Sequence, residues 1–161
     1  MSEGYTQVFC GDGDGKSSAA LGKGLISAGN GKKVIVIRFL KSKLNNEILF
    51  FSRLEPEIKL FRFEKSNEGF EKLSPEDKAE EIMNIKNGIN FARKVLITGE
   101  CDILILDEVL KLIEEGILKA EELINVLKER SPQTTVFMTG HILPVELEEY
   151  VDCVSEVTMR K

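Results

Sequence analysis

The sequence predicts an α/β fold in which a mainly parallel β-sheet lies between two layers of helices. Short runs of β-branched and other apolar residues alternate along the 161-residue chain with longer segments of helical character. The run at residues 33–40, KVIVIRFL, is apolar on both faces, as is typical of parallel strands covered on both sides. A turn with three glycines joins the first such run, at residues 5–9, to the first helical segment. Together these observations predict one ligand-binding edge at the carboxyl ends of the strands.

Composition narrows the possible classes of protein. The 161 residues fit one domain, which we expect to cover residues 1–161, and the 42% hydrophobic and 30% charged residues are ordinary for a globular chain. The net charge of −5 argues against a nucleic-acid partner, because phosphate backbones require a basic surface. No apolar run approaches the roughly 20 residues that span a bilayer, and no signal-peptide pattern is present. We therefore expect no membrane partner.

The cysteines indicate the compartment. Cys10, Cys101 and Cys153 are odd in number and show no C-x-x-C spacing. We interpret them as reduced thiols of a cytoplasmic protein rather than as disulfides or a zinc site. Each is expected to fill a small apolar space at a strand end, and Cys10 is the one that could come near a ligand.

The glycine-rich turn is the first candidate site. Glycines at alternate positions allow backbone angles that other residues avoid, so successive N–H groups can point into one concavity. The helix expected at residues 17–29 adds unpaired N–H groups and the positive end of its dipole. Lys16 supplies a mobile ammonium group, and the Ser17 hydroxyl can ligate a Mg²⁺ ion held by phosphates. The candidate phosphate-binding residues are Gly11, Asp12, Gly13, Asp14, Gly15, Lys16, Ser17 and Ser18.

This turn matches the P-loop pattern G-x-x-x-x-G-K-[ST] only in part. Gly15, Lys16 and Ser17 fit, but Cys10 stands at the position of the first glycine. The Asp14 carboxylate would repel a polyphosphate unless it points to solvent or to the metal. A glycine-rich turn without a ligand is the alternative, but the strand–loop–helix context favours a phosphate site. The pattern therefore predicts a three-layer αβα P-loop nucleotide-binding fold with a mainly parallel sheet.

The next segments continue the alternation. Lys41 follows the second strand and is a candidate contact for the nucleotide. A short helix is predicted at residues 46–54 and a third strand at residues 58–63. Residues 64–73 are polar and predict a loop, in which residue type alone favours Phe70 as an anchor against the core over a ligand contact.

A long helix is predicted after this loop. Ser74 as the N-cap, Pro75 and two acids form a strong helix start, and Gly99 marks the end. The charged residues of this helix are most simply interpreted as a solvent-facing surface. They are Lys78, Glu80, Glu81, Lys86, Arg93 and Lys94.

A second candidate site ends the strand predicted at residues 101–108, where Asp107 and Glu108 stand side by side. One acid can hold a metal through water or through the Ser17 hydroxyl, while the other can ligate metal, bind ribose hydroxyls or orient a nucleophile. An apolar run ending in two acids is common and can merely cap the next helix. Its place after a P-loop favours the functional interpretation.

The remaining elements follow in the same order. Helices are predicted at residues 109–115 and 120–130, a strand at 134–138, a helical segment at 144–150 and a final strand at 153–159. Ligands of open α/β sheets bind beyond the carboxyl ends of strands, so His141 is a candidate nucleotide contact. A lone histidine at this edge is equally compatible with no role.

These motifs together resemble the P-loop corrinoid adenosyltransferases, which act on cob(I)alamin or cob(I)yrinic acid a,c-diamide. The strongest part is a shortened loop that lacks its first glycine, combined with Thr139-Gly140 after the fifth strand. Common P-loop hydrolases do not share this combination. The resemblance runs in order along nearly the whole chain, through residues 4–22, 36–41, 68–70, 105–108, 139–140 and 154–156.

The resemblance implies a reaction in which the 5′-deoxyadenosyl group of ATP moves to the Co(I) of a reduced corrinoid and triphosphate is released. Ser17 and Glu108 match the family's metal-contacting positions, with Asp107 behind them. The implied catalytic residues are Lys16, Glu108 and Phe70, of which Phe70 would help to displace the lower ligand of cobalt. An electron-donating flavoprotein reductase and a homodimer are further expectations from the family.

Three positions depart from the family pattern. Lys72 stands where several members carry a tryptophan, His141 stands where arginine follows Thr-Gly, and Asp14 replaces a loop lysine. Two other functions stay open on the sequence. One is a P-loop phosphohydrolase or kinase, in which Glu108 would orient a water or a hydroxyl. The other is a nucleotide- or corrinoid-binding protein without catalysis.

Overall fold

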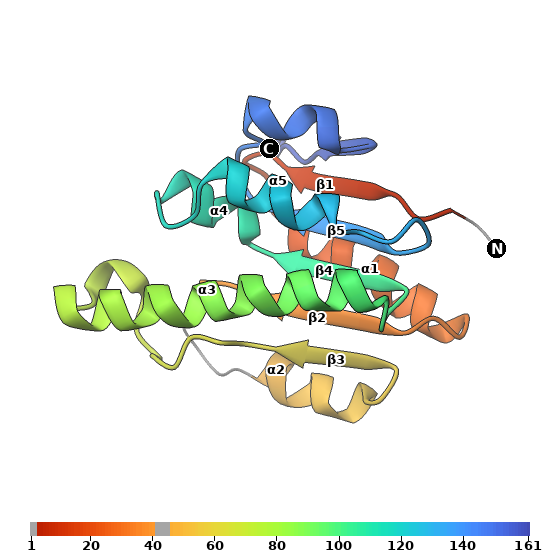
Figure 1. The fold of residues 1–161 in the computed structure, drawn as a ribbon, viewed down its shortest axis with the longest axis horizontal. Helices are drawn as coiled ribbons and strands as arrows, with labels where there is room; N and C mark the ends of the chain where they lie inside the picture. Colours follow the sequence, from red (N-terminus) through yellow and green to blue (C-terminus); the bar gives the residue numbers. More distant parts are fainter. Residues whose placement is uncertain (1–2, 41–45) are drawn as a thin grey trace.

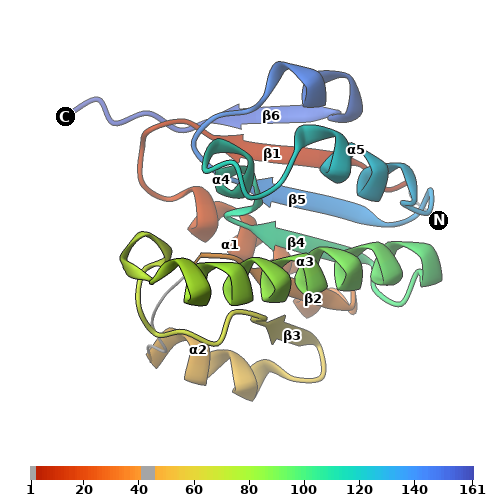
Figure 2. The ribbon, with the colours of Figure 1, turned by 60° about the vertical axis from the view of Figure 1, so that its left-hand side comes forward.

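The computed structural model describes residues 3–40 and 46–161, and the strands in these ranges form one six-stranded sheet. The strand order is β3-β2-β4-β5-β1-β6, of which Figure 1 labels the first five strands and Figure 2 all six. The strands are β1 (Thr6–Cys10), β2 (Val34–Arg38), β3 (Ile58–Phe61), β4 (Ile103–Asp107), β5 (Thr135–Thr139) and β6 (Cys153–Glu156). All neighbouring pairs are parallel, so every strand ends at the same edge. The predicted α/β fold is confirmed, and the sheet is wholly parallel.

Helices cover both faces of this sheet (Figure 2). One face carries α1 (Lys16–Gly29), α2 (Asn46–Phe51) and the 3₁₀ turn η1 (Ser52–Leu54), and the other carries α3 (Pro75–Thr98), α4 (Val109–Glu114) and α5 (Ala120–Lys128). Two further 3₁₀ turns are η2 (Phe70–Lys72) and η3 (Val145–Tyr150). Within residues 3–40 and 46–161, no helix has both the length and the apolar character that crossing a membrane requires.

Helix ends follow the local sequence signals. At the start of α3 the Ser74 hydroxyl accepts a hydrogen bond of 3.2 Å from the Asp77 N–H, which satisfies one unpaired donor of the first turn. At its end Gly99 adopts a left-handed conformation with φ 63°, and its N–H bonds to the Val95 carbonyl. In α1 a Cβ at Gly24 would lie 2.8 Å from Ile105 Cδ1, so the small residue lets this helix approach the sheet closely.

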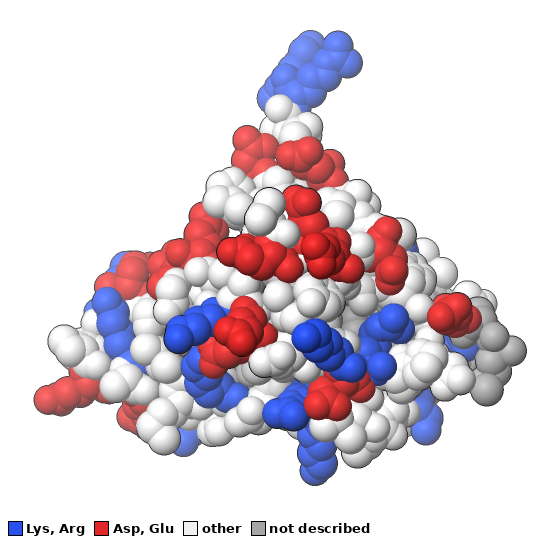
Figure 3. Space-filling model, turned by 45° about the horizontal axis from the view of Figure 1, so that its top comes forward, with Lys and Arg blue, Asp and Glu red and all other residues white. Residues whose placement is uncertain are grey.

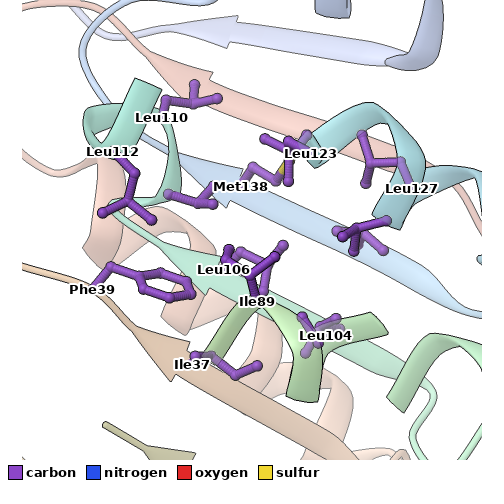
Figure 4. Packing of buried hydrophobic residues seen from close by; sticks show 14 of the residues in the cluster. Ile37, Phe39, Ile89, Leu104, Leu106, Leu110, Leu112, Leu123, Leu127 and Met138 are labelled. Atoms are coloured by element: carbon purple, nitrogen blue, oxygen red, sulfur yellow. The ribbon is translucent and has the colours of Figure 1, made fainter. Parts of the chain in front are cut away.

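Two apolar clusters hold the three layers together, one on each face of the sheet. Figure 4 shows the larger one, in which side chains of β2, β4 and β5 meet those of α3, α4 and α5. Ile37, Leu106 and Met138 represent the three strands, and Ile89 and Leu123 two of the helices. Burial of this apolar surface is the main term that favours the fold, and it leaves the carboxyl edge of the sheet as a rigid base for a site.

The carboxyl-terminal part of the chain differs from the prediction in detail. The final strand ends at Glu156 rather than at residue 159, and the segment predicted as helical after Pro144 is the 3₁₀ turn η3. Cys10 and Cys101 are buried as expected, but Cys153 is exposed, so its predicted role as an apolar filler is wrong. The reason is topological, because β6 is an edge strand with β1 as its only neighbour in the sheet.

Candidate functional site

The two motifs singled out by the sequence meet at the carboxyl edge of the sheet. Ser17, in the first turn of α1, donates a hydrogen bond of 2.6 Å from its hydroxyl to Asp107 Oδ1 at the end of β4. The parallel topology brings them together, because β1 and β4 are separated only by β5 and all three strands end at this edge. The glycine-rich loop and the acid pair therefore form one site.

Asp107 is the centre of a buried polar network. It is completely buried, and its Oδ1 also accepts a hydrogen bond of 2.8 Å from Thr139 Oγ1. On its other side Arg38 Nε lies 3.1 Å from Asp107 Oδ2, and Arg38 is itself only 3% exposed. A buried ion pair is tolerated only with good geometry and additional hydrogen bonds, since desolvation of each charge costs several kcal/mol. The network therefore fixes β2, β4, β5 and α1 relative to one another at this edge.

Glu108 turns the chain out of the sheet immediately after Asp107. Its φ of 65° is a left-handed value that is uncommon outside glycine, and its N–H bonds to Thr139 Oγ1 at 2.8 Å. The side chain is half-buried, and in the described part of the chain its carboxylate has no hydrogen-bond or ion-pair partner. Glu108 therefore carries an uncommitted carboxylate on the residue that directly follows Asp107.

The glycines shape the loop in an unexpected way. Gly11 has φ 106°, and its N–H bonds to the His141 carbonyl at 2.8 Å. The Gly13 N–H bonds to the Val157 carbonyl at 2.8 Å, and a Cβ on Gly11 would lie 2.4 Å from that same oxygen. Backbone that follows β6 thus crosses directly over the loop. Only glycine fits under it, and these two amides are engaged within the protein.

The other loop amides are unpaired in the described structure. The N–H groups without a protein acceptor are those of Asp12, Asp14, Gly15, Lys16, Ser17 and Ser18. The first helical N–H to be paired is that of Ala19, which bonds to the Gly15 carbonyl at 2.8 Å. Lys16 Nζ lies over the same loop and donates a hydrogen bond of 2.6 Å to the Gly11 carbonyl. Amides, ammonium and helix N-terminus together form an arrangement suited to an anion.

Long-range charge gives little support to anion binding. The chain carries a net charge of −5, and on the face drawn in Figure 3 acidic side chains gather over the upper half of the molecule. Glu146 and Glu148 of η3 are exposed acids of the described chain. Attraction of a polyphosphate must therefore come from groups within a few ångströms, which are the loop amides and Lys16.

The remaining nucleotide candidates are placed as follows. Asp12, Asp14 and Ser18 are exposed, so the Asp14 carboxylate can avoid the loop by facing solvent, as its position beside phosphates would require. Burial and the nearby Glu156 charge raise the pKa of the Cys10 thiol, which keeps it protonated. Lys41 lies outside the described residues.

His141 contributes its backbone to the loop. Its carbonyl accepts the Gly11 N–H, whereas its imidazole Nδ1 lies 3.3 Å from Glu114 Oε1 and the side chain is 51% exposed. The ring is therefore paired with α4, and the contact that the structure gives it with the loop runs through the main chain.

Phe70 has features both of an anchor against the core and of a residue that could contact a ligand. Its ring is half-buried and packs against the larger apolar cluster, with Lys78 Nζ 5.7 Å from the ring centroid. Phe70 also lines a cavity of about 200 Å³ together with Leu40, Gly69, Glu71, Lys111 and Glu115. Lys72, at the position of the family's tryptophan, is exposed. Phe70 is thus anchored on one side and lines a cavity of the surface on the other.

Sequence reasoning missed four polar residues near this edge as site residues. Arg38 and Thr139 hold Asp107, while Glu64 is buried within the loop that carries Phe70 and Glu81 is buried against it. The prediction that Glu81 faces solvent is wrong, because it is only 6% exposed. Burial raises the pKa of the Glu64 carboxyl, an effect that backbone hydrogen bonds and Arg62 oppose. A charged residue inside an apolar strand, as in VIVIR of β2, was the one available signal.

Comparison with known families gives a single answer. Residues 2–161 match the family described as ATP:corrinoid adenosyltransferase BtuR/CobO/CobP. The corrinoid adenosyltransferase of Escherichia coli strain K12 is 30% identical over 154 residues, which are 96% of this chain and 76% of that protein. The corrinoid adenosyltransferase CobA of Salmonella typhimurium is 29% identical with the same coverage. That of Pseudomonas aeruginosa is 27% identical over 159 residues.

A solved structure supports the fold alone. Part of EssC (ATPases 2 and 3) from Geobacillus thermodenitrificans superposes with a TM-score of 0.50 and 19% identity. The match covers 95% of this chain but only 32% of that one. At this identity the similarity extends to the three-layer architecture and carries no statement about activity.

Proposed function

Because the chain belongs to the ATP:corrinoid adenosyltransferase family BtuR/CobO/CobP, we propose that it transfers the 5′-deoxyadenosyl group of ATP to the cobalt of a reduced corrinoid. In this step the electron pair of Co(I) forms the bond to the ribose C5′. The bond from C5′ to the phosphate oxygen breaks, its electrons leave with triphosphate, and cobalt becomes formally Co(III). No proton has to move, so the protein contributes alignment and stabilisation of the leaving group.

The observation that carries the proposal is the hydrogen bond of 2.6 Å between Ser17 and Asp107. It joins the phosphate loop to the acid pair in one rigid, buried network. The unpaired amides of residues 12 and 14–18 and the Lys16 ammonium are the groups that we propose bind a triphosphate. We assign Lys16 to stabilisation of the triphosphate as it leaves.

Mg²⁺ fits the donor set beside the loop. The Ser17 hydroxyl and the uncommitted Glu108 carboxylate are the ligands we propose, because Mg²⁺ usually takes one or two carboxylates and substrate phosphates. Asp107 would act through Ser17, since Arg38 and Thr139 already occupy its oxygens. The described residues contain no cluster of three or more potential metal-binding side chains, so phosphate oxygens would complete the coordination. Bound Mg²⁺ would neutralise charge on the triphosphate.

We propose that the corrinoid binds over the surface cavity of about 200 Å³ beside Phe70. Leu40 at the end of β2 and Lys111 of α4 form its other walls, so it opens at the same edge as the phosphate loop. An aromatic ring at this point can exclude the lower ligand of cobalt, which makes Co(II) easier to reduce. Phe70 is therefore the third residue, with Lys16 and Glu108, that we propose as catalytic.

Several further features rest on family membership. We propose that the protein is a homodimer and that an electron-donating flavoprotein reductase is its partner. We also propose that residues 1–161 form one P-loop domain, which binds both substrates at one edge of the sheet. A cytoplasmic location is supported by three cysteines that are all free.

The proposed reaction is tested with MgATP and chemically reduced cob(I)alamin. We expect a light-sensitive product with a cobalt–carbon bond and one triphosphate for each corrinoid adenosylated, with no phosphate product when corrinoid is omitted. Release of ADP and phosphate without corrinoid would contradict the proposal and favour a phosphohydrolase or kinase. ATP binding with no turnover on Co(I) would favour a binding protein.

Phe70→Ala is expected to slow the reaction that starts from Co(II) but not the reaction that starts from Co(I). MgATP affinity and the rate from supplied Co(I) should stay unchanged, whereas the rate from Co(II) should fall roughly tenfold or more, since misplacement of a reacting group can cost up to about a hundredfold. Both rates are measured by absorbance. Phe50→Ala, at an exposed phenylalanine of α2, is the matched control. Equal Co(II) rates for Phe70→Ala and the parent would reduce Phe70 to a structural anchor.

A further inference from the structure

Two buried glutamates make hydrogen bonds at the segment that carries Phe70. We call this segment, residues 62–73 between β3 and α3, the Phe70 loop. Glu64 belongs to it and is 8% exposed, while Glu81 belongs to α3 and is 6% exposed. A buried carboxylate is costly unless hydrogen bonds compensate for lost water. Neither glutamate belongs to the Asp107 network. The hydrogen bonds that each of them accepts therefore show which part of the chain it holds in place.

Glu81 binds the backbone of the Phe70 loop. Its Oε1 accepts hydrogen bonds from the Lys65 N–H at 3.0 Å and from Asn84 Nδ2 at 2.9 Å. Its Oε2 accepts from the Ser66 N–H at 3.4 Å. The side chain of Arg62 donates to the Ser66 carbonyl from the other direction. A side chain of a long, rigid helix thus fixes the loop backbone just before Phe70.

Glu64 ties the same loop to the end of β2. Its Oε1 accepts a hydrogen bond of 3.3 Å from the Leu40 N–H. Its Oε2 lies 4.0 Å from Arg62 Nε, which is too long for a hydrogen bond, and both atoms are buried without another partner. Among the described residues, the groups that act on the Glu64 carboxylate are the Leu40 amide, Arg62 and, as a repelling charge, Glu81.

The two glutamates and Phe70 line the same small cavity. Glu64, Glu81 and Arg62 line a small space of about 20 Å³, and Leu40 and Phe70 are also among its walls. Leu40 and Phe70 in turn line the cavity of about 200 Å³ that we assign to the corrinoid. The carboxylates and the corrinoid cavity thus lie on two sides of the same pair of apolar side chains. A loop released from Glu81 would let Phe70 move.

We propose that Glu64 and Glu81 are positioning residues that hold Phe70 at the corrinoid cavity and so govern the reaction that starts from Co(II). This rests on the proposed function, because it assumes that Phe70 displaces the lower ligand of cobalt. Glu81 acts through the backbone of the Phe70 loop, and Glu64 acts by joining that loop to the Leu40 backbone. Their effect is therefore specific for the cobalt(II) state and separate from ATP binding.

The test compares Glu81→Ala with Glu80→Ala, which removes an exposed carboxylate from the neighbouring position of the same helix. Glu81→Ala is expected to slow adenosylation from Co(II) roughly tenfold or more while leaving MgATP affinity and the rate from Co(I) unchanged. Glu81→Gln keeps one acceptor oxygen and should fall between parent and alanine variant. Glu64→Ala should act in the same direction but more weakly, because it has a single backbone hydrogen bond. Glu80→Ala should match the parent.

A spectroscopic readout makes the result independent of turnover. Electron paramagnetic resonance of cob(II)alamin bound with MgATP shows whether nitrogen remains the lower ligand of cobalt. We expect the parent to contain a fraction without that ligand and Glu81→Ala to lose this fraction. Failure of the parent to adenosylate Co(I) would overturn the proposed function, whereas an unchanged spectrum in Glu81→Ala would overturn the positioning role.

A double-mutant cycle distinguishes positioning from general destabilisation. In a Phe70→Ala background, Glu81→Ala is expected to cause no further loss of the Co(II) rate, because the residue that it positions is already absent. An additional loss of the same factor, or equal slowing of the Co(II) and Co(I) rates, would show a purely structural role. If Glu81→Ala does not fold, Glu81→Gln decides by the same criteria.

Discussion

Replacement of Lys16 by alanine is expected to weaken MgATP binding by about 10- to 100-fold, because hydrogen bonds to charged groups contribute roughly 1.5–3 kcal/mol. The Lys16 ammonium lies over the loop and contacts the Gly11 carbonyl at 2.6 Å, so it can reach a bound phosphate without rearrangement of the backbone. The side chain is only partly buried and makes no ion pair within the described structure. Stability should therefore change little while affinity falls. Isothermal titration calorimetry with MgATP measures the effect.

The matched control for Lys16 is Lys94→Ala. Lys94 is exposed in the last turns of α3, toward the end of the helix that leads into the amino end of β4 and thus away from the loop. The Lys94→Ala variant loses the same charge as Lys16→Ala but keeps the loop intact, so its MgATP affinity should equal that of the parent. Unchanged binding in Lys16→Ala would mean that the glycine-rich loop is not the triphosphate site.

Replacement of Asp107 by alanine is expected to have the largest effect on stability. It would remove one partner of the buried ion pair between Arg38 and Asp107, a loss that typically costs about 3–5 kcal/mol. The same change removes the acceptor of the Ser17 and Thr139 hydroxyls. Urea denaturation followed by circular dichroism measures the loss, and MgATP affinity should fall with it because Ser17 loses its orientation.

Asp102→Ala provides the comparison for Asp107. Asp102 precedes the same strand at the opposite edge of the sheet, is half-buried, and accepts a hydrogen bond of 2.8 Å from the Lys33 N–H. Loss of such a bond should cost about 1 kcal/mol and leave ATP binding intact. If Asp107→Ala is no less stable than Asp102→Ala, the pairing with Arg38 contributes nothing to the fold.

Local signals in the sequence predicted the individual elements well. Alternating apolar strands and helices, the glycine-rich turn and the caps of α3 at Ser74 and Gly99 depend on interactions between residues close in the chain. Errors in the bounds and exposure of the last strand arise where such interactions are weak. β6 has a single neighbour in the sheet, so its end and the exposure of Cys153 followed from its place at the edge rather than from its own pattern.

The sequence by itself therefore determined the α/β class, the glycine-rich loop, the acid pair and the family resemblance, since each is written in a short run of residue types. Only the tertiary structure decided which polar groups serve that loop. Arg38 meets Asp107 across 69 residues, and the Val157 carbonyl takes the Gly13 amide because β6 pairs with β1. Glu81 is buried because the Phe70 loop folds over it. Strand order and packing create these contacts between distant segments, and a pattern read along one chain segment does not contain them.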